Sequence, residues 1–563
     1  MKRVIALCLA LLLLGLLAGC ADKPAAPTGT EPAGTPGSTA APDTTAAPEA
    51  PAPAEELAVP VPAGVVPAAD NNRVFYEIFV GSFSDSDGDG IGDLRGVINR
   101  MDYLNDGDPQ SGKSLGIEGI WLSPIFPSNS YHKYDANDYY SVDPAFGTLE
   151  DLKELAALCR ARNVKLILDL AINHTSRMHP WFNSFVQAHR SGAKDDPYYN
   201  FYSFYTKGES APAGRSFAAL SGTEDYYECN FDGGMPELNY DCEEVRQAVL
   251  EVAKFWLDQG VDGFRFDAAK YLYYGDNNAS VGFWVWYLDQ LRAYKPDLYA
   301  VGEVWDGDGV TQLYYPAMNC FDFSTSQAEG LIASTAQQGN ANRYTAYVQD
   351  YLEKVKSQRE DANIVPFIAN HDTDRAAGFL PLHNGSAQMA ANLLILGPGS
   401  PFLYYGEELG MRGSRGGANT DANRRLAMVW GDGDTVADPK GSTYPADVRA
   451  DATAAQQLGQ EGSLYNYYKK VILLRQANPE IAMGSYAALQ LADTKAGGFI
   501  SEWNGSRVLV LHNPSGSAVT LDLAALGLAE FTQLSGFVGL GEVKLEGSTV
   551  SLDAQSSAVL RVG

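Results

Sequence analysis

The chain has 563 residues, 45% of them hydrophobic, and a formal net charge of −28. This length predicts two to four domains, and the composition supplies enough apolar side chains for a large core. The negative charge argues against nucleic acid or an anionic membrane surface as a partner. It is compatible with a soluble protein that acts on a neutral substrate, although an acidic surface also serves solubility alone.

The first twenty residues have the pattern of a bacterial export signal. Lys2 and Arg3 precede an apolar run, residues 5–17, that is too short to span a membrane comfortably. Residues 17–20 read LAGC, which resembles a lipobox, where cleavage precedes a cysteine that receives lipid. We therefore expect a lipoprotein signal peptide over residues 1–19 and lipid on Cys20, with an ordinary signal peptide as the alternative.

Residues 20–71 are rich in Pro, Ala, Thr, Gly and Glu and have almost no aromatic side chains. Such a segment cannot bury enough apolar surface to fold, so a disordered tether is expected. The protein is then expected to be extracellular, held at the outer face of the cell membrane by its N-terminal lipid alone.

Four of the six cysteines lie beyond the signal and the tether, and their spacing matches no zinc motif. They are Cys159, Cys229, Cys242 and Cys320. Export permits disulfides, and Cys229–Cys242 is the only pair close enough in sequence to suggest one. Buried free thiols are the alternative.

From residue 73 onward, strand and helix patterns alternate. The β-rich runs are residues 73–80, 119–122, 164–170, 261–266, 298–302, 364–368 and 401–405, with a less regular run at 318–323. Helical spacing appears over residues 149–162 and 243–259. This alternation indicates βα units and a parallel sheet, and at this length it favours a (β/α)8 TIM barrel over an open sheet.

Two stretches interrupt that alternation. About seventy residues, rich in Tyr, Phe, Gly and Asn, separate the run ending at residue 170 from the helix at 243, which predicts an inserted domain. After a helix at residues 465–477, short alternating runs with Gly, Asn and Ser turns predict a C-terminal antiparallel β domain.

Acidic residues stand at the ends of four predicted barrel strands: Asp169, Asp267, Glu303 and Asp372. Histidine or arginine lies beside three of them. Barrel enzymes collect their reactive groups at the carboxyl ends of the strands. Converging acids of this kind suit glycoside hydrolysis, which needs a carboxylate nucleophile and a protonated acid, but they could equally hold a metal for hydrolysis.

Four segments, in this order, resemble the signature regions of the α-amylase family of glycoside hydrolases (family 13). They are residues 169–174 (DLAINH), 263–270 (GFRFDAAK), 301–304 (VGEV) and 367–372 (FIANHD). Residues 235–239 (MPELN) and 397–408 (GPGSPFLYYGEE) resemble two further motifs of the family. The export signal makes the pattern similar to that of bacterial lipoprotein α-amylases.

The resemblance implies a fold and its divisions. It implies a catalytic barrel over residues 72–174 and 243–480, with an inserted domain B over 175–242 after the third strand. A C-terminal antiparallel β-sandwich is expected over residues 481–563. The implied substrates are α-glucans, namely starch and maltooligosaccharides.

The resemblance also assigns catalytic roles. Asp267 matches the nucleophile, Glu303 the general acid/base, and Asp372 the third carboxylate, which stabilises the transition state. Glu303 must then hold a proton near neutrality, so burial or neighbouring negative charge should raise its pKa. Arg265 is expected to keep Asp267 ionised and oriented.

Other residues match groups that contact the sugar beside the cleaved bond. Tyr134 matches an aromatic platform, His174 and His371 match sugar-binding histidines, and Asp169 matches a structural acid of the same subsite. Lys270 matches a residue that binds the glucose unit beyond the cleaved bond.

Tyr271 departs from the family pattern, because many α-amylases have histidine at this position after Lys270. The departure puts binding on the product side in doubt. It also puts in doubt a calcium site to which that histidine and Asn173 would contribute.

A different calcium site is expected in residues 85–93 (DSDGDGIGD). Carboxylates at alternating positions around a Gly-rich turn suit Ca²⁺, which prefers oxygen ligands. The segment also resembles a calcium loop after the first strand in several family members. The expected ligands are Asp85, Asp87, Asp89, Ile91 and Asp93, with a structural role for the ion; a solvated acidic turn is the alternative.

Specificity is indicated by Ala268, which follows the nucleophile position as in family members that act on α-1,4 bonds. Residues 132–135 (HKYD) instead resemble cyclomaltodextrinases and neopullulanases, which usually carry an extra N-terminal β domain that this chain replaces with a tether. Glucan transfer is a further alternative. A non-catalytic starch-binding lipoprotein is disfavoured, because all three catalytic carboxylates are present.

The lipobox-like segment predicts that labelled fatty acid enters the wild-type protein and does not enter the Cys20→Ala variant. Labelling in a bacterial host, followed by immunoprecipitation, measures this directly. Equal labelling of the two proteins would contradict lipid attachment at Cys20.

Overall fold

The computed structural model describes residues 70–489, 491 and 495–563. Cys20, the signal peptide and all but the last two residues of the predicted tether lie outside the described residues. Within the described part of the chain, no helix combines the length and apolar composition that crossing a membrane would require.

Eight parallel strands form the central sheet, in the order β10-β9-β8-β7-β3-β2-β1-β11. They are β1 (Phe75–Ile78), β2 (Gly119–Leu122), β3 (Lys165–Leu170), β7 (Gly263–Phe266), β8 (Tyr299–Gly302), β9 (Asn319–Asp322), β10 (Val365–Pro366) and β11 (Phe402–Tyr404). A parallel bridge between Phe367 and Phe402 joins the two edges of this order. The predicted barrel is confirmed, and the less regular run at residues 318–323 forms its sixth strand.

The strands are buried on both faces, which explains why their sequences are nearly continuous apolar runs. Side chains that pack inside the barrel are Phe75, Trp121, Ile167, Tyr299, Val301, Phe321, Val365, Phe367 and Phe402. These rings and branched chains fill the barrel, so no channel runs through it.

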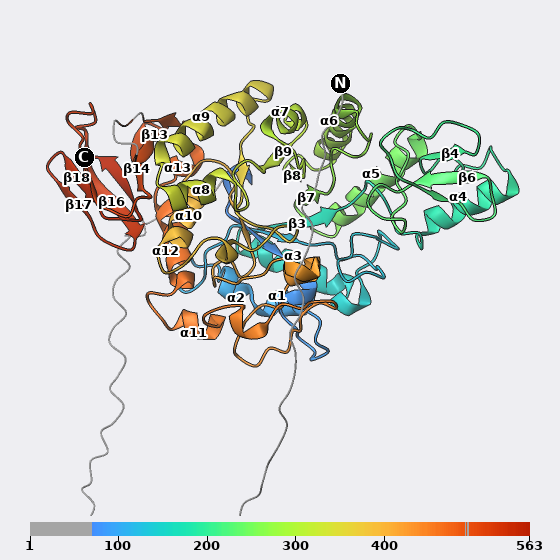
Figure 1. Cartoon of the computed structure of the whole chain (residues 1–563), viewed down its shortest axis with the longest axis horizontal. Coiled ribbons are helices and arrows are strands. Elements are labelled where there is room, and N and C mark those ends of the chain that lie inside the picture. Colours follow the sequence, from blue (N-terminus) through green and yellow to red (C-terminus); the bar gives the residue numbers. More distant parts are fainter. Residues whose placement is uncertain (1–69, 490, 492–494) are drawn as a thin grey trace, which may run out of the picture. The chain divides into compact units, whose positions relative to one another are not determined.

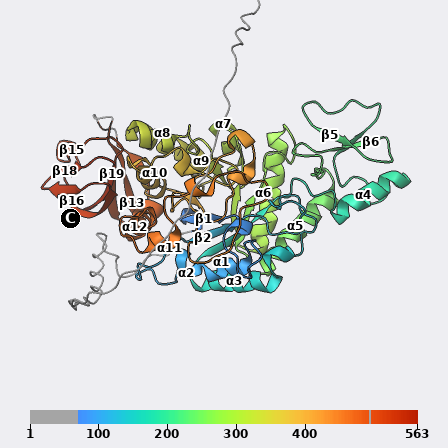
Figure 2. The same ribbon diagram turned by 60° about the horizontal axis from the view of Figure 1, so that its bottom comes forward.

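The helices are α1 (Leu94–Asn99), α2 (Met101–Leu104), α3 (Leu149–Ala161), α4 (Pro180–Ser191), α5 (Glu243–Asp258), α6 (Asn277–Tyr294), α7 (Asp308–Thr311), α8 (Leu331–Gln338), α9 (Ala341–Gln358), α10 (Ser386–Ile395), α11 (Ala454–Leu458), α12 (Leu464–Ala477) and α13 (Glu480–Met483). Helix α3 begins at a capping box in which Thr148 and Asp151 each accept the other's backbone N–H. Helices α5 and α6 pack side by side (Figure 2). They precede and follow β7 in the chain, the strand that ends just before Asp267.

The segment between β3 and α5 folds separately from the barrel sheet. It contains α4 and an antiparallel sheet in the order β4-β6-β5. Its strands are β4 (Phe204–Thr206), β5 (Phe217–Ala219) and β6 (Asp225–Glu228). An insertion of this kind was expected at this point of the chain.

The C-terminal segment forms two antiparallel sheets, in the orders β12-β13-β14-β19-β16 and β15-β18-β17 (Figure 1). The strands are β12 (Ala487–Ala488), β13 (Gly497–Trp503), β14 (Ser506–Asn513), β15 (Val519–Asp522), β16 (Phe531–Gly539), β17 (Val543–Glu546), β18 (Thr549–Leu552) and β19 (Ser556–Val562). A separate apolar core, which includes Leu509, Leu521 and Leu560, packs in this segment. The predicted antiparallel β domain is confirmed.

The four cysteines of the described residues are buried free thiols: Cys159, Cys229, Cys242 and Cys320. Cys229 and Cys242 are therefore not joined by a disulfide in this structure. Of the two alternatives that the sequence left open, the structure has the free thiols.

Candidate active site

The barrel brings the four predicted acids to one end of the sheet. Asp169 lies within β3, while Asp267, Glu303 and Asp372 follow β7, β8 and β10. A pocket of about 1040 Å³ opens at this end, and Asp267, Glu303 and Asp372 line it. Its other walls include Tyr134, His174, Phe231, Tyr271, Trp305, Arg424 and Arg425.

Arg265 is fully buried beneath the pocket and binds three of the acids. Its Nη1 donates to Asp267 Oδ1 at 2.6 Å and to Asp169 Oδ1 at 3.0 Å. Its Nη2 forms an ion pair with Glu303 Oε1 at 3.1 Å. One guanidinium thus holds Asp267, which follows β7, close to Glu303, which follows β8.

Glu303 is 8% exposed, and its surroundings favour the protonated form. Burial raises the pKa of Glu303 to about 7; the negative charges of Asp267 and Asp372 also raise it, against the opposing effect of Arg265. The backbone N–H of Ala268 donates to Glu303 Oε2 at 3.0 Å. A carboxyl group with this pKa can give up or accept a proton near neutrality.

Asp372 has the opposite electrostatic environment. Although burial opposes ionisation, the charges of His371 and Arg425 hold the pKa of Asp372 well below its usual range. His371 Nε2 lies 3.0 Å from Asp372 Oδ2, and Arg425 Nη2 donates to Asp372 Oδ1 at 2.7 Å. Burial lowers the pKa of His371, but Asp372 and Glu77 outweigh it and raise that pKa to about 10. Asp372 therefore stays anionic and His371 stays cationic.

Tyr134 connects the charged groups around Arg265 with the pair formed by His371 and Asp372. Its hydroxyl donates to Asp169 Oδ2 at 2.8 Å and lies 2.7 Å from His371 Nε2. The ring stacks on the His371 imidazole, with 5.4 Å between the ring centroids, and forms part of the pocket wall. Burial raises the pKa of Asp169 to about 7, although Arg265 opposes this shift.

His174 lines the pocket, and its Nε2 has no hydrogen-bond partner. Burial lowers the pKa of His174, so the imidazole is neutral near pH 7. An unpaired ring nitrogen at a pocket wall can exchange a hydrogen bond with a ligand hydroxyl.

The ammonium of Lys270, a predicted sugar ligand, is bound by other groups of the protein. Its Nζ donates to the Trp305 carbonyl oxygen at 2.6 Å and to Asp306 Oδ2 at 3.0 Å. Tyr271, next in the chain, does line the pocket. Asn173 is buried, and its Oδ1 has no hydrogen-bond partner.

Sequence reasoning missed Glu77, Trp121 and Arg425. Glu77 Oε1 lies 2.6 Å from His371 Nδ1, and Trp121 Nε1 donates to Asp169 Oδ2 at 3.2 Å. Glu77 could have been identified from the sequence, because a charged residue inside an apolar strand is seldom buried without a partner. Arg425 lies in an irregular segment 53 positions after Asp372, and nothing in its local sequence marks it.

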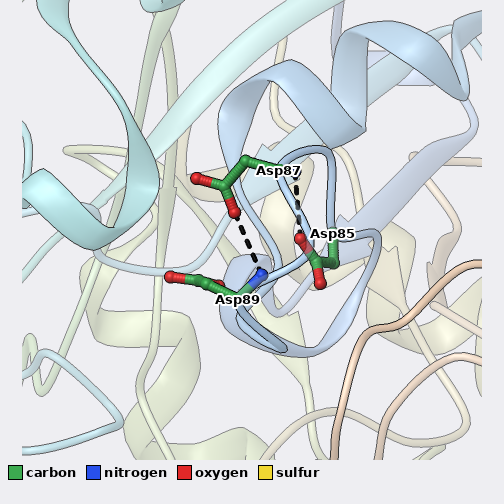
Figure 3. Close-up of side chains that lie close together, drawn as sticks. All are labelled: Asp85, Asp87 and Asp89. Carbon is green, nitrogen blue, oxygen red and sulfur yellow. Dashed lines mark hydrogen bonds between the residues drawn. The ribbon is translucent and has the colours of Figure 1, made fainter.

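The acidic turn brings together three of its predicted ligands. Figure 3 shows Asp85, Asp87 and Asp89 on one loop, and their carboxylate oxygens lie within 4.8 Å of one another. Gly88 and Gly90 have φ of 87° and 89°, which lets the chain turn tightly between them. This donor set consists of oxygen alone, which is the chemistry that Ca²⁺ prefers.

Asp93 and Ile91 are outside this group of three. Asp93 caps α1, because its Oδ1 accepts the N–H of Gly96 at 2.7 Å and its Oδ2 accepts that of Ser86 at 2.9 Å. Ile91 is 40% exposed, and its N–H donates to Asp89 Oδ1 at 2.7 Å.

Comparison with known proteins agrees with this geometry. Residues 77–484 match the family model described as "Alpha amylase, catalytic domain". The chain is 34% identical to "Alpha-amylase 3" of Dictyoglomus thermophilum over 450 residues, which cover 78% of this chain and 84% of the relative. It is 28% identical to the cyclomaltodextrinase of Thermoanaerobacter pseudethanolicus over 487 residues, 84% of this chain and 71% of the relative.

A solved structure is similar along most of its length. The structure of Eubacterium rectale Amy13B has 34% sequence identity and a TM-score of 0.81, covering 88% of this chain and 96% of that one. The family match over residues 77–484 contains every residue of the pocket described above and all of the barrel strands except the first two residues of β1. The chain therefore belongs to the α-amylase family of glycoside hydrolases.

Proposed function

We propose that the protein is an α-amylase that hydrolyses α-1,4-glucosidic bonds of starch or maltooligosaccharides with retention of configuration. The observation that carries this proposal is the Arg265 guanidinium, which contacts both Asp267 and Glu303 at the pocket floor. A retaining glycosidase needs its two carboxyl groups close together, about 5–5.5 Å apart, whereas an inverting enzyme leaves room for a water between them. Shared contact with one guanidinium suits the closer arrangement.

In the first step, a carboxylate oxygen of Asp267 attacks the anomeric carbon and forms a glycosyl ester. The bond from that carbon to the leaving glucan breaks, and Glu303 gives its proton to the departing oxygen. The raised pKa of Glu303 supplies the protonated acid, and the hydrogen bond from Arg265 holds the Asp267 carboxyl group in place.

In the second step, Glu303 takes a proton from water, and the water oxygen attacks the same carbon. The ester bond breaks and returns Asp267 to its starting state, so two inversions leave the product with the substrate's configuration. The anionic Asp372 stabilises the positive charge that develops on the sugar in both transition states. The ring of Tyr134 and the Nε2 of His174 bind that sugar.

The preference for α-1,4 bonds is supported by Ala268 after the nucleophile and by similarity to a relative named α-amylase. The similarity to a cyclomaltodextrinase supports the main alternative. A non-catalytic starch-binding role is disfavoured, because the acids form a connected site in which Glu303 favours the protonated form and Asp372 favours the anionic form.

Two further proposals concern the rest of the chain. We propose that calcium bound by Asp85, Asp87 and Asp89 stabilises the loop after β1. Their all-oxygen cluster supports this proposal.

We also propose that the enzyme works outside the cell, attached to the membrane by lipid on Cys20. The sequence pattern alone supports this proposal.

The mechanism predicts that fresh product is the α-anomer and that Asp267→Asn loses nearly all turnover, because an amide cannot form the glycosyl ester. Glu303→Gln should be severely impaired on starch and much less so on maltosyl fluoride, whose leaving group needs no proton. Proton NMR of fresh product and steady-state rates on both substrates measure this.

A β-anomer appearing first, or near-normal turnover by Asp267→Asn, would overturn the assignment. Rates on starch, maltotetraose, cyclodextrin and pullulan test the specificity. Faster hydrolysis of cyclodextrin or pullulan than of starch would support the cyclomaltodextrinase alternative instead.

The raised pKa of Glu303 predicts a pH dependence with a definite sign. Glu303 must carry its proton to start the reaction, so kcat/KM for starch should fall as pH rises above about 7. The fall should approach about tenfold per pH unit. Maltosyl fluoride is the matched control, because its first step needs no acid; an identical alkaline decline on both substrates would contradict this role for Glu303.

The calcium proposal predicts that a chelator lowers the melting temperature and that added Ca²⁺ restores it. With calcium at roughly 100 times its Kd, binding would contribute about 2.7 kcal/mol to the free energy of unfolding. Asp87→Asn should blunt the response, whereas Asp289→Asn, which removes the same charge from an exposed position on α6, should not. A melting temperature that changes with neither chelator nor calcium would count against the site.

A further inference from the structure

The carboxylate of Asp372 is bound by an arginine that comes from an irregular part of the chain. Arg425 Nη2 donates to Asp372 Oδ1 at 2.7 Å, and Arg425 Nε donates to the His371 carbonyl oxygen at 3.0 Å. Residues 426–430, which follow this arginine, belong to no helix or strand. Because such a segment lacks the regular hydrogen bonds of a helix or sheet, other parts of the chain must hold it in place.

Two charged side chains, Asp438 and Arg449, hold the peptide groups of Ala427. Asp438 Oδ1 accepts the N–H of Ala427 at 2.9 Å, and Arg449 Nη1 donates to the Ala427 carbonyl oxygen at 3.4 Å. Asp438 and Arg449, here called the Ala427 clamp, also form an ion pair with each other. Ala427 is buried, so leaving its N–H without a partner would cost free energy.

Uncharged groups hold the peptides on either side of Ala427. The hydroxyl of Tyr405 donates to the Leu426 carbonyl oxygen at 2.6 Å, and the N–H of Met428 donates to the Ser82 carbonyl oxygen at 2.8 Å. The clamp therefore completes the set of bonds that holds residues 426–428, directly after Arg425.

The part of the chain that carries Asp438 is anchored on the acidic loop after β1. The N–H of Ala437 donates to the Gly90 carbonyl oxygen at 2.9 Å. The hydroxyl of Thr435 donates to Asp85 Oδ2 at 2.6 Å. Asp438 is thus held in position by contacts outside its own segment.

The clamp acts on the reaction only through the segment that it holds. Neither Asp438 nor Arg449 lines the catalytic pocket, whereas Arg425 and Asp372 both do. Arg425 lies two positions before Ala427, so a shift of the Ala427 peptide also shifts the backbone from which the guanidinium extends.

We propose that Asp438 and Arg449 are positioning residues, which hold the Ala427 peptide so that the guanidinium of Arg425 stays against Asp372. The proposal rests on the proposed function, in which Asp372 stabilises the charge that develops on the sugar. Without Asp438, the Ala427 N–H loses its partner and the segment shifts toward other acceptors. Misplacing a group of an active site by about 1 Å can lower the rate by as much as about 100-fold.

The first test removes the clamp and measures steady-state rates. Asp438→Ala should lower kcat/KM by about tenfold for starch and for maltosyl fluoride alike, because Asp372 acts on the sugar that both substrates share. Asp438→Asn, which keeps an oxygen for the Ala427 N–H, should lose less. Asp447→Ala removes the same charge from an exposed position nearby and should match the wild type.

A double-mutant cycle separates positioning from a general loss of structure. Arg425→Met removes the guanidinium that the clamp holds, so in that background Asp438→Ala should lower kcat/KM by less than about twofold. Arg449→Met should show the same pattern and replaces Asp438→Ala if that variant does not fold. Wild-type kcat/KM in the clamp variants, or equal losses with and without Arg425, would overturn the proposal.

Amide hydrogen exchange gives a readout that does not depend on catalysis. Exchange at residues 426–428 should be faster in Asp438→Ala than in the wild type or in Asp447→Ala. Unchanged exchange would overturn the clamp. A wild-type enzyme that cleaves neither starch nor maltosyl fluoride would overturn the proposed function, while faster exchange in Asp438→Ala would still support the hold of the clamp on Ala427.

Discussion

The active site depends on one buried cation, the guanidinium of Arg265. It faces three carboxyl groups, those of Asp169, Asp267 and Glu303, which are all buried. One positive charge cannot neutralise three negative ones in such a place, so protons must supply the balance. Burial raises the pKa values of Asp169 and Glu303 to about 7, and the negative charge of Asp267 adds to both shifts, while Arg265 binds Asp267 at the shortest distance of the three.

A second group of charges gives Asp372 the opposite state. His371 lies between Asp372 and Glu77, and Arg425 adds a further positive charge. Two carboxylates near one imidazole raise the pKa of His371, which in turn stabilises the anionic form of Asp372. Neighbouring carboxyl groups in different environments have different pKa values. One pocket can therefore hold both a protonated acid and a permanent anion.

The sequence predicted those parts of the structure that local pattern controls. Apolar runs identified seven of the eight barrel strands. The positions of Asp267 and Glu303 at strand ends predicted that their side chains lie close together. Strand β9 was less evident, because its sequence, Asn-Cys-Phe-Asp, mixes polar and apolar residues that are all buried. Contacts that arise only when distant segments meet could not be predicted, as with Arg425 beside Asp372. Lys270 shows the same limit, since its motif position says nothing of Asp306, the carboxylate that binds its ammonium.

The backbone after β7 shows how tightly the two catalytic segments are joined. Ala268 has φ of 50°, in the left-handed region, which costs a residue with a side chain about 1–2 kcal/mol. That conformation is held by Ala268 N–H on the Glu303 carboxylate and by Ala269 N–H on the Glu303 carbonyl oxygen at 3.0 Å. Glu303 N–H returns a bond to the Phe266 carbonyl oxygen at 2.9 Å. The strained residue lies directly after Asp267, so the hydrogen bonds that offset its strain also fix the nucleophile segment relative to Glu303.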